Sequence, residues 1–172
     1  RTSGFIDKMV ELLNKKGIKT AVTGHDKFKN DVNEADAKVV IEVRVPAQVD
    51  DAAGKTEAST VLEKEDTIAI YGSNEFAAKA IINANGGFKE SKLGADKILA
   101  VGFDSGALQQ DAIRKGIFVG SVTQDPVQIG YQAVKLAIAA AKGETVKDVD
   151  TGSKWYDAKN IDSEEIKALL YE

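Results

Sequence analysis

Short polar side chains follow three apolar, strand-like runs in this sequence, and they are the residues best suited to binding chemistry. They are Asn74 and Glu75 after the first run, Asp104 and Ser105 after the second, and Gln124 and Asp125 after the third. Carboxylate and amide groups hydrogen-bond well to hydroxyls, so such side chains, if they converge, could bind a polyol. The same residue types are also common helix caps and turn formers. The sequence leaves both interpretations open.

The residue types needed for catalysis or for a metal site are scarce. His25 is the only histidine and the chain has no cysteine, which excludes disulfides, zinc-thiolate sites and cysteine nucleophiles. No serine has a candidate histidine base in the strand-turn-helix context of a hydrolase. We therefore expect a protein that is not an enzyme and that uses no cofactor and no metal.

Composition narrows the function classes further. The 172 residues include 23 Lys and Arg against 27 Asp and Glu, giving a net charge of −4, and 43% are hydrophobic. This is enough apolar material for one good core. Nucleic-acid binding is disfavoured because the charge balance is acidic and the basic residues are scattered. No stretch approaches the ~20 apolar residues of a membrane helix.

Because the chain starts at Arg1 rather than Met, we expect a processed product or a fragment.

Strand-like and helix-like runs alternate along the chain. Apolar and β-branched runs predict strands at 18–23, 38–45, 67–71, 97–103 and 117–122, and an extended segment at 146–155. Helical spacing predicts helices at 5–13, 51–64, 75–85, 108–115, 126–142 and 163–170. Apolar strands between amphipathic helices predict an α/β three-layer sandwich with a mostly parallel sheet. Ligands bind at the carboxyl ends of such strands, where the polar residues lie.

Two features near the end of the chain carry specific expectations. The longest predicted helix begins at Pro126 and ends at Gly143, with an inward face formed by Ile129, Ala133, Leu136, Ala137 and Ala140. Trp155 and Tyr156 could stack on a ligand or cover an apolar edge of the sheet.

Three segments together resemble a known family. They are IAIYGSNEFAAKAI (68–81), ILAVGFDSGALQQDAIRKG (98–116) and VGSVTQDPVQIGYQAVKLA (119–137), supported by RTSGF (1–5) and DDAAGKTEASTVLE (50–63). In this order and spacing they resemble the periplasmic sugar-binding proteins of the ribose-binding type. Effector domains of the lactose-repressor family share that fold. The resemblance covers most of the chain and only the carboxy-terminal part of a complete family member. The tail WYDAKNIDSEEIKALLYE (155–172) resembles the sugar-binding proteins more than the repressors.

The resemblance implies four ligand-binding residues. Asp104 of GFD would accept hydrogen bonds from sugar hydroxyls, and Asn74 of GSNE would donate and accept through its amide. Gln124 of TQDP would lie at the hinge between two lobes. Arg1 would donate hydrogen bonds from its guanidinium group to sugar oxygens. The family often has an aromatic residue, for stacking on the sugar, where this sequence has Val49.

The resemblance also implies an organisation. Residues 1–172 would form one flavodoxin-like or Rossmann-like lobe of a type I periplasmic-binding-protein fold, with an insertion near 14–37. The helix at 126–142 would pack on an amino-terminal lobe outside this chain, or on a second copy of the chain. The protein would be periplasmic or extracellular and lipid-anchored, would contact an ABC permease, and would neither bind nucleic acid nor insert into a membrane.

The function implied is that of a monosaccharide or polyol receptor for an ABC-type sugar importer. Two alternatives remain open. One is the effector-binding domain of a lactose-repressor-family transcription regulator. The other is a stand-alone flavodoxin-like interaction module with no sugar affinity.

Overall fold

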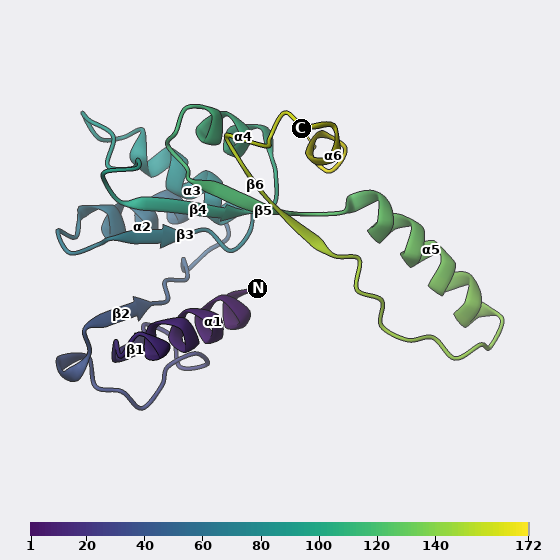
Figure 1. Ribbon diagram of the computed structural model, residues 1–172, viewed down its shortest axis with the longest axis horizontal. Helices are drawn as coiled ribbons and strands as arrows, with labels where there is room; N and C mark the ends of the chain where they lie inside the picture. The colour runs from purple at the N-terminus through teal and green to yellow at the C-terminus, as the bar shows by residue number, and fades with distance from the viewer. Residues whose placement is uncertain (172) are drawn as a thin grey trace. The chain divides into compact units, whose positions relative to one another are not determined.

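The computed structural model describes residues 1–171, and the chain forms two compact units (Figure 1). The first unit is Arg1–Glu57 and the second begins at Ala58. The division falls within helix α2 (Asp51–Glu63), which contributes to both units. Each unit is described by itself below.

The first unit contains a small parallel sheet and one long helix. Helix α1 (Thr2–Lys15) precedes strand β1 (Thr20–Thr23), the short 3-10 helix η1 (Glu34–Asp36) and strand β2 (Val39–Glu42). Gly17 has φ +70° and its N–H donates to the Asn14 carbonyl at 2.9 Å, so a glycine ends α1 as predicted. Strands β1 and β2 are parallel, with Thr20 paired to Val39. Both strands were expected from the sequence.

The segment near 14–37 therefore adds strand β1 and a loop. Asn30 in that loop accepts a hydrogen bond from Val22 N at 3.0 Å and donates to the Thr20 carbonyl at 3.1 Å. The Asn30 side chain therefore forms two hydrogen bonds with the backbone of β1. The segment near 14–37 is part of the first unit and is hydrogen-bonded to its sheet, and its being an insertion relative to the family stays a prediction.

The second unit contains a four-stranded sheet in the order β3-β4-β5-β6. Its elements are β3 (Ala69–Tyr71), α3 (Glu75–Asn85), β4 (Leu99–Phe103), α4 (Ala107–Arg114), β5 (Gly120–Gln124), α5 (Pro126–Ala141), β6 (Ser153–Asp157) and α6 (Glu164–Lys167). Strands β3, β4 and β5 are parallel, whereas β6 is antiparallel to β5. The predicted α/β class with a mostly parallel sheet is confirmed.

One hydrophobic core joins the sheet of the second unit to its helices. Leu62 of α2, Ile81 of α3 and Ile113 of α4 are buried together with Ala100 of β4 and Tyr156 of β6. Phe118 and Tyr156 are the largest of its fully buried side chains. Burying a large apolar side chain stabilises a fold by about 1.5–3 kcal/mol, so this core fixes the strands whose ends carry the polar residues.

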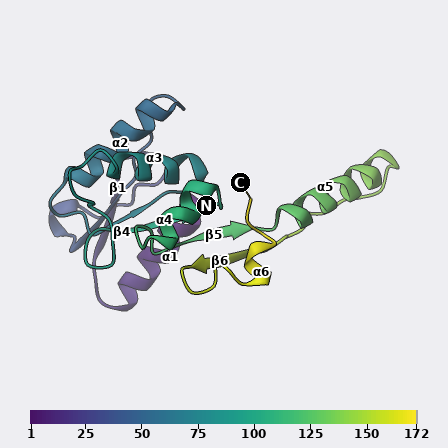
Figure 2. The ribbon, with the colours of Figure 1, turned by 90° about the horizontal axis from the view of Figure 1, so that it is seen from above.

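Helix α5 contradicts one expectation. None of its residues is buried, and Ile129, which was assigned to an inward face with Ala133, Leu136, Ala137 and Ala140, is 40% exposed. Figure 1 and Figure 2 show α5 continuing from β5 away from the sheet. The prediction of an inward face was wrong, because no core formed by residues 1–171 buries this face of α5.

Within residues 1–171, no helix combines the length and apolar character needed to cross a membrane.

Three element boundaries also differ from the prediction. Strand β5 begins at Gly120 rather than at residue 117, because Ile117 and Phe118 donate to the Ala112 carbonyl and complete the turn after α4. Only the end of the predicted extended segment 146–155 becomes strand, since β6 begins at Ser153. Helix α6 occupies only Glu164–Lys167 of the predicted 163–170.

Candidate functional site

Asp104, directly after β4, has a backbone conformation that is unusual for a residue with a side chain. Its φ is +74°, in the left-handed region that costs most L-residues about 1–2 kcal/mol. Three groups donate hydrogen bonds to its carbonyl oxygen: Tyr156 Oη at 2.8 Å, Ser121 Oγ at 2.9 Å and Gln109 Nε2 at 3.3 Å. These bonds hold the turn and thereby fix the direction in which the Asp104 side chain leaves the backbone.

The Asp104 carboxylate links two neighbouring loops. Its Oδ2 atom accepts a hydrogen bond from the Glu75 N–H at 3.2 Å, at the first turn of α3. The Asp104 N–H donates to the Val122 carbonyl at 2.8 Å, which ties the same residue to β5. Asp104 is half-buried. A carboxylate held in this way has a fixed position, and its oxygen atoms, which together carry several lone pairs, suit it to accepting hydrogen bonds from hydroxyl groups.

Asn74 and Asp125 both act as helix caps. Asn74 Oδ1 accepts the Ala77 N–H at 2.8 Å at the start of α3, and Asp125 Oδ1 accepts the Gln128 N–H at 2.8 Å at the start of α5. The capping interpretation is therefore confirmed for these two residues. Capping engages only the oxygen of Asn74, which is exposed, and the Nδ2 donors of its amide are not needed for it.

The end of β5 is joined to the Asp104 turn through buried hydroxyls. Thr123 Oγ1 lies 3.2 Å from Ser105 Oγ, and both residues are fully buried. Ser105 therefore supports the turn from inside and is not available to a ligand. Gln124, the last residue of β5, is half-buried and pairs with Ser153 of β6. The polar residues after β3, β4 and β5 thus belong to one connected edge of the sheet.

Of the two roles that the sequence left open for Tyr156, the structure agrees with covering an apolar edge of the sheet. Tyr156 lies on edge strand β6 and is fully buried in the core, so it cannot stack on a ligand. Burial raises the pKa of its phenol to about 12. Its hydrogen bond to Asp104 spans 52 positions of sequence. Sequence patterns missed Tyr156, Ser121 and Gln109 as supports of Asp104, because periodicity reports local structure and these contacts depend on the sheet order.

Arg1 and Val49 belong to the first unit. Arg1 precedes α1, and its carbonyl accepts the Phe5 N–H at 3.0 Å. Val49 is 87% exposed, in the segment before α2. The role given to Arg1 by the family resemblance stays a prediction, and so do the ligand contacts of Asn74, Asp104 and Gln124.

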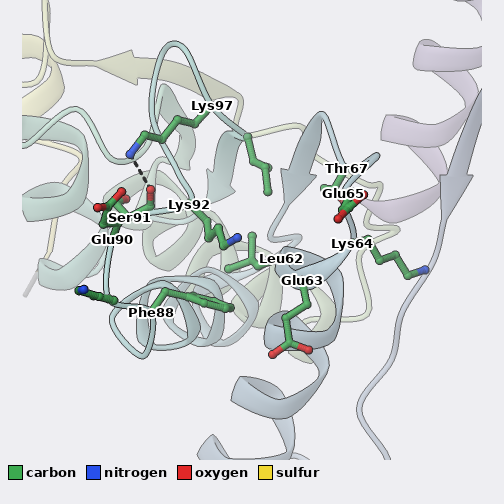
Figure 3. Close-up of a pocket in the computed structure, with 12 residues that line it drawn as sticks. Leu62, Glu63, Lys64, Glu65, Thr67, Phe88, Glu90, Ser91, Lys92 and Lys97 are labelled. Carbon is green, nitrogen blue, oxygen red and sulfur yellow. Dashed lines mark hydrogen bonds between the residues drawn. The ribbon is translucent and has the colours of Figure 1, made fainter.

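A hollow of the second unit lies apart from this edge of its sheet. It has a volume of about 710 Å³ and is lined by residues next to the starts of β3 and β4, among them Ile98. Figure 3 shows Thr67 and several Lys and Glu side chains around it. Because ligands of parallel sheets bind at carboxyl ends, this hollow lies at the less favourable edge.

The first unit has a hollow of its own, of about 670 Å³, which is lined by residues that follow β1, including His25 and Asp26.

The single histidine lies in a loop. His25 follows β1, and its Nδ1 accepts the Lys27 N–H at 3.2 Å. Residues 1–171 contain no group of three or more His, Cys, Asp or Glu side chains placed to hold a metal ion.

Solved structures share this fold. A protein of Brachyspira murdochii, described as an ABC transporter and LacI family transcriptional regulator, is 35% identical with a TM-score of 0.73 over 99% of this chain and 63% of that one. An ABC transporter solute-binding protein of Agrobacterium vitis with bound D-fucose is 26% identical, with a TM-score of 0.68 over 94% of this chain and 59% of that one. The glucose-galactose binding protein GanP of Geobacillus stearothermophilus is 22% identical, with a TM-score of 0.62 over 94% and 61% of the two chains, which shows the fold alone.

The chain spans less than two thirds of the length of each of these relatives. No curated protein matches the sequence significantly. The family model described as the periplasmic binding protein domain matches residues 3–145, which is most of the chain. That match agrees with the parallel sheet and with the polar edge that follows β3, β4 and β5. This chain belongs to the periplasmic binding protein domain family.

Proposed function

We propose that this chain is the sugar-binding lobe of a solute receptor that delivers a monosaccharide or similar polyol to an ABC importer. The observation that carries the proposal is the Asp104 turn. The backbone carbonyl of Asp104 accepts hydrogen bonds from α4, β5 and β6, and its carboxylate accepts the Glu75 N–H of α3, at the sheet edge where α/β proteins bind ligands.

The groups around that turn suit a polyhydroxyl ligand. Asp104 offers carboxylate lone pairs, Asn74 offers amide donors and Gln124 offers a further amide. Hydrogen bonds to an ionised carboxylate are about twice as strong as neutral ones, so Asp104 would contribute most. The relative that holds D-fucose is 26% identical to this chain. D-fucose is therefore the first sugar to test.

The proposal assigns α5 to an interface with an amino-terminal lobe. Its polar side chains Gln128, Gln132 and Lys135 fall on one narrow side, and apolar residues occupy most of the remaining circumference. A helix that is apolar nearly all round is normally buried. Val127, Tyr131 and Val134 are each more than 60% exposed in this chain. A second lobe, or alternatively a second copy of this chain, would cover them.

In this proposal the protein is periplasmic or extracellular and lipid-anchored, and the closed form contacts the permease. Sugar would favour lobe closure only through contacts that the open form lacks. Residues 126–142 and Gln124 would connect the two lobes, and the ligand would lie between them.

The experiment is a thermal-shift panel of pentoses, hexoses, deoxyhexoses and inositols on this chain. Ligand at about 100 times its Kd adds roughly 2.7 kcal/mol to the free energy of unfolding, so one stereoisomer should raise Tm clearly. Addition of the amino-terminal lobe as a separate polypeptide is the second arm. If no sugar raises Tm in either arm, the chain is not a sugar receptor and the interaction-module alternative is favoured.

A second candidate is the effector-binding domain of a transcription regulator. The specific observation is that the 35% identical relative is described as both a transporter and a LacI family regulator. Both functions predict that a sugar raises Tm. They are distinguished by what the full gene encodes before this chain. A helix-turn-helix domain encoded in frame upstream would support the regulator, and a lipoprotein signal would support the receptor.

A further inference from the structure

We infer that Tyr171 is a positioning residue of the Asp104 site, because its phenol joins the loop that starts α3 to the loop that starts α4. This inference rests on the proposed function, since it concerns the same ligand edge. The family resemblance assigned no role to this residue. The contacts of Tyr171 are the evidence.

The Tyr171 side chain contacts both loops. Its hydroxyl donates a hydrogen bond to Glu75 Oε2 at 3.2 Å, and the backbone N–H of Ser105 lies near its oxygen and lowers its pKa. Glu75 is the residue whose own N–H donates to Asp104 Oδ2, and Ser105 follows Asp104 directly. The Tyr171 hydroxyl therefore closes a ring of contacts around the Asp104 carboxylate, with a bond to the α3 loop and the Ser105 N–H of the α4 loop beside it.

The Glu75 carboxylate lies directly against Gly106, at the start of α4. A Cβ atom added at Gly106 would lie 2.2 Å from Glu75 Oε1, so the glycine leaves room for the carboxylate in this position. Burial, the hydrogen bond to Glu75 and the nearby Asp104 and Glu75 charges raise the pKa of Tyr171, and the nearby Ser105 N–H opposes them. The phenol therefore stays protonated at neutral pH and remains a donor to Glu75.

The segment that carries Tyr171 is itself anchored. Gln110 Nε2 lies 2.9 Å from the Tyr171 carbonyl and 2.7 Å from the Ser105 carbonyl. Thr123 Oγ1 lies 3.2 Å from the Leu169 carbonyl. Residues 169–171 are thus fastened to α4 and to the end of β5. These bonds place Tyr171 beside the Asp104 turn, although the two residues are far apart in the sequence.

The consequence for a ligand is geometric. Loss of the Tyr171 hydroxyl leaves the Glu75 carboxylate without this bond and removes the polar neighbour of the Ser105 N–H, so both loops gain freedom. The Asp104 carboxylate would then be held less firmly in the position that the turn after β4 gives it. A polyol that depends on Asp104 should bind more weakly, although Tyr171 need not touch it.

The test uses the full chain and the Tyr171→Phe variant. The matched control is Thr67→Val, which removes one side-chain hydrogen bond, from Thr67 Oγ1 to the Val61 carbonyl, just before β3. Hydrogen exchange of the Glu75 and Ser105 amides is first followed by NMR without ligand. D-fucose is then titrated, and after it the other sugars of the panel. We expect Tyr171→Phe to speed exchange of the Glu75 amide about tenfold and to weaken sugar binding by a similar factor, the effect of about one hydrogen bond. Thr67→Val should change neither.

The outcomes separate the inference from the function. Unchanged exchange at Ser105 and Glu75 overturns the bridge, whatever the sugar result. Faster exchange with unchanged sugar affinity overturns the positioning role and leaves a contact that only stabilises the fold. A wild-type chain that binds no sugar overturns the proposed function and the positioning role together, and the exchange data then report on the bridge alone.

Discussion

The phenol oxygen of Tyr156 lies 2.8 Å from the backbone carbonyl oxygen of Asp104, so strand β6 holds the turn that ends β4. Strand β5 lies between these two strands and contributes Ser121 to the same carbonyl. The candidate ligand residue is therefore positioned by three adjacent strands of one sheet. The antiparallel strand at the sheet edge is part of the site's support.

Replacing Tyr156 by Phe should remove one hydrogen bond and keep the packing. Ser121 and Gln109 still donate to the Asp104 carbonyl, so we expect the free energy of unfolding to fall by about 1 kcal/mol. Urea unfolding measures this directly. A loss near zero would mean that the phenol does not contribute to holding the turn.

The same pair predicts a pH dependence. Burial raises the pKa of Tyr156 to about 12, above its ordinary value of 10.0. The unfolded chain therefore ionises first as pH rises, and the stability contributed by Tyr156 is complete below pH 10.0 and lost as pH rises towards 12. By about pH 11 the wild type should lose roughly 1 kcal/mol more than Tyr156→Phe. Parallel pH curves for the two proteins would contradict this.

Asp104→Asn separates the charge of Asp104 from its conformation. Asn tolerates the left-handed region and keeps an oxygen that can accept the Glu75 N–H. We expect the free energy of unfolding to change by less than about 0.5 kcal/mol, while sugar affinity falls at least about tenfold. Calorimetric titration with the sugar selected by the panel gives the affinity.

Asp104→Ala and Asp104→Gly are the matched pair for that experiment. Both lack the carboxylate, and we expect both to abolish sugar binding without unfolding the chain. Only Ala retains the cost of a Cβ at positive φ, so the Gly variant should be the more stable of the two by about 1 kcal/mol. Retained sugar affinity in either would refute the assignment of Asp104.

Asn74 tests whether one residue both caps a helix and binds ligand. Asn74→Asp keeps the cap of α3 and removes the amide donors, so we expect near-normal stability and weaker sugar binding. Asn74→Ala should in addition lower the free energy of unfolding by about 1 kcal/mol. If Asn74→Asp binds sugar as well as the wild type does, capping is its whole role.

Helix α5 should make this chain associate. We expect sedimentation equilibrium to show concentration-dependent self-association, or binding to the amino-terminal lobe, that Val134→Asp with Ile138→Asp abolishes. Both side chains are more than half exposed, so the double variant should change the free energy of unfolding by no more than about 0.5 kcal/mol per site. A monodisperse wild-type monomer that ignores the lobe would contradict the interface.

Most of the fold was predictable because it rests on local patterns. The glycine end of α1, the helix at 75–85 and the strand before Asp104 follow from periodicity and turn chemistry. The outward position of Ile129 was not predictable in the same way. An apolar pattern predicts that a helix face is buried, and it does not say whether the burying surface belongs to the same chain.

The site was predictable only in outline. Polar residues after parallel strands indicated the edge, and the resemblance named Asn74, Asp104 and Gln124. The supports of the Asp104 turn were not predictable, because Tyr156 and Tyr171 reach it from sequence positions far away. Nothing in their local sequence distinguishes them from tyrosines of an ordinary core or surface.

The pairing of Gln124 with Ser153 makes residues 125–152 an exchangeable module. The chain leaves the sheet after Gln124 and enters it again at Ser153. No residue of α5, which lies between them, is buried. A tight hairpin turn could replace the whole excursion, and the shorter closure would save about 2 kcal/mol of chain entropy. Evolution or a protein engineer could therefore exchange this excursion, changing which partner the lobe joins, while the carboxylate of Asp104 keeps its place.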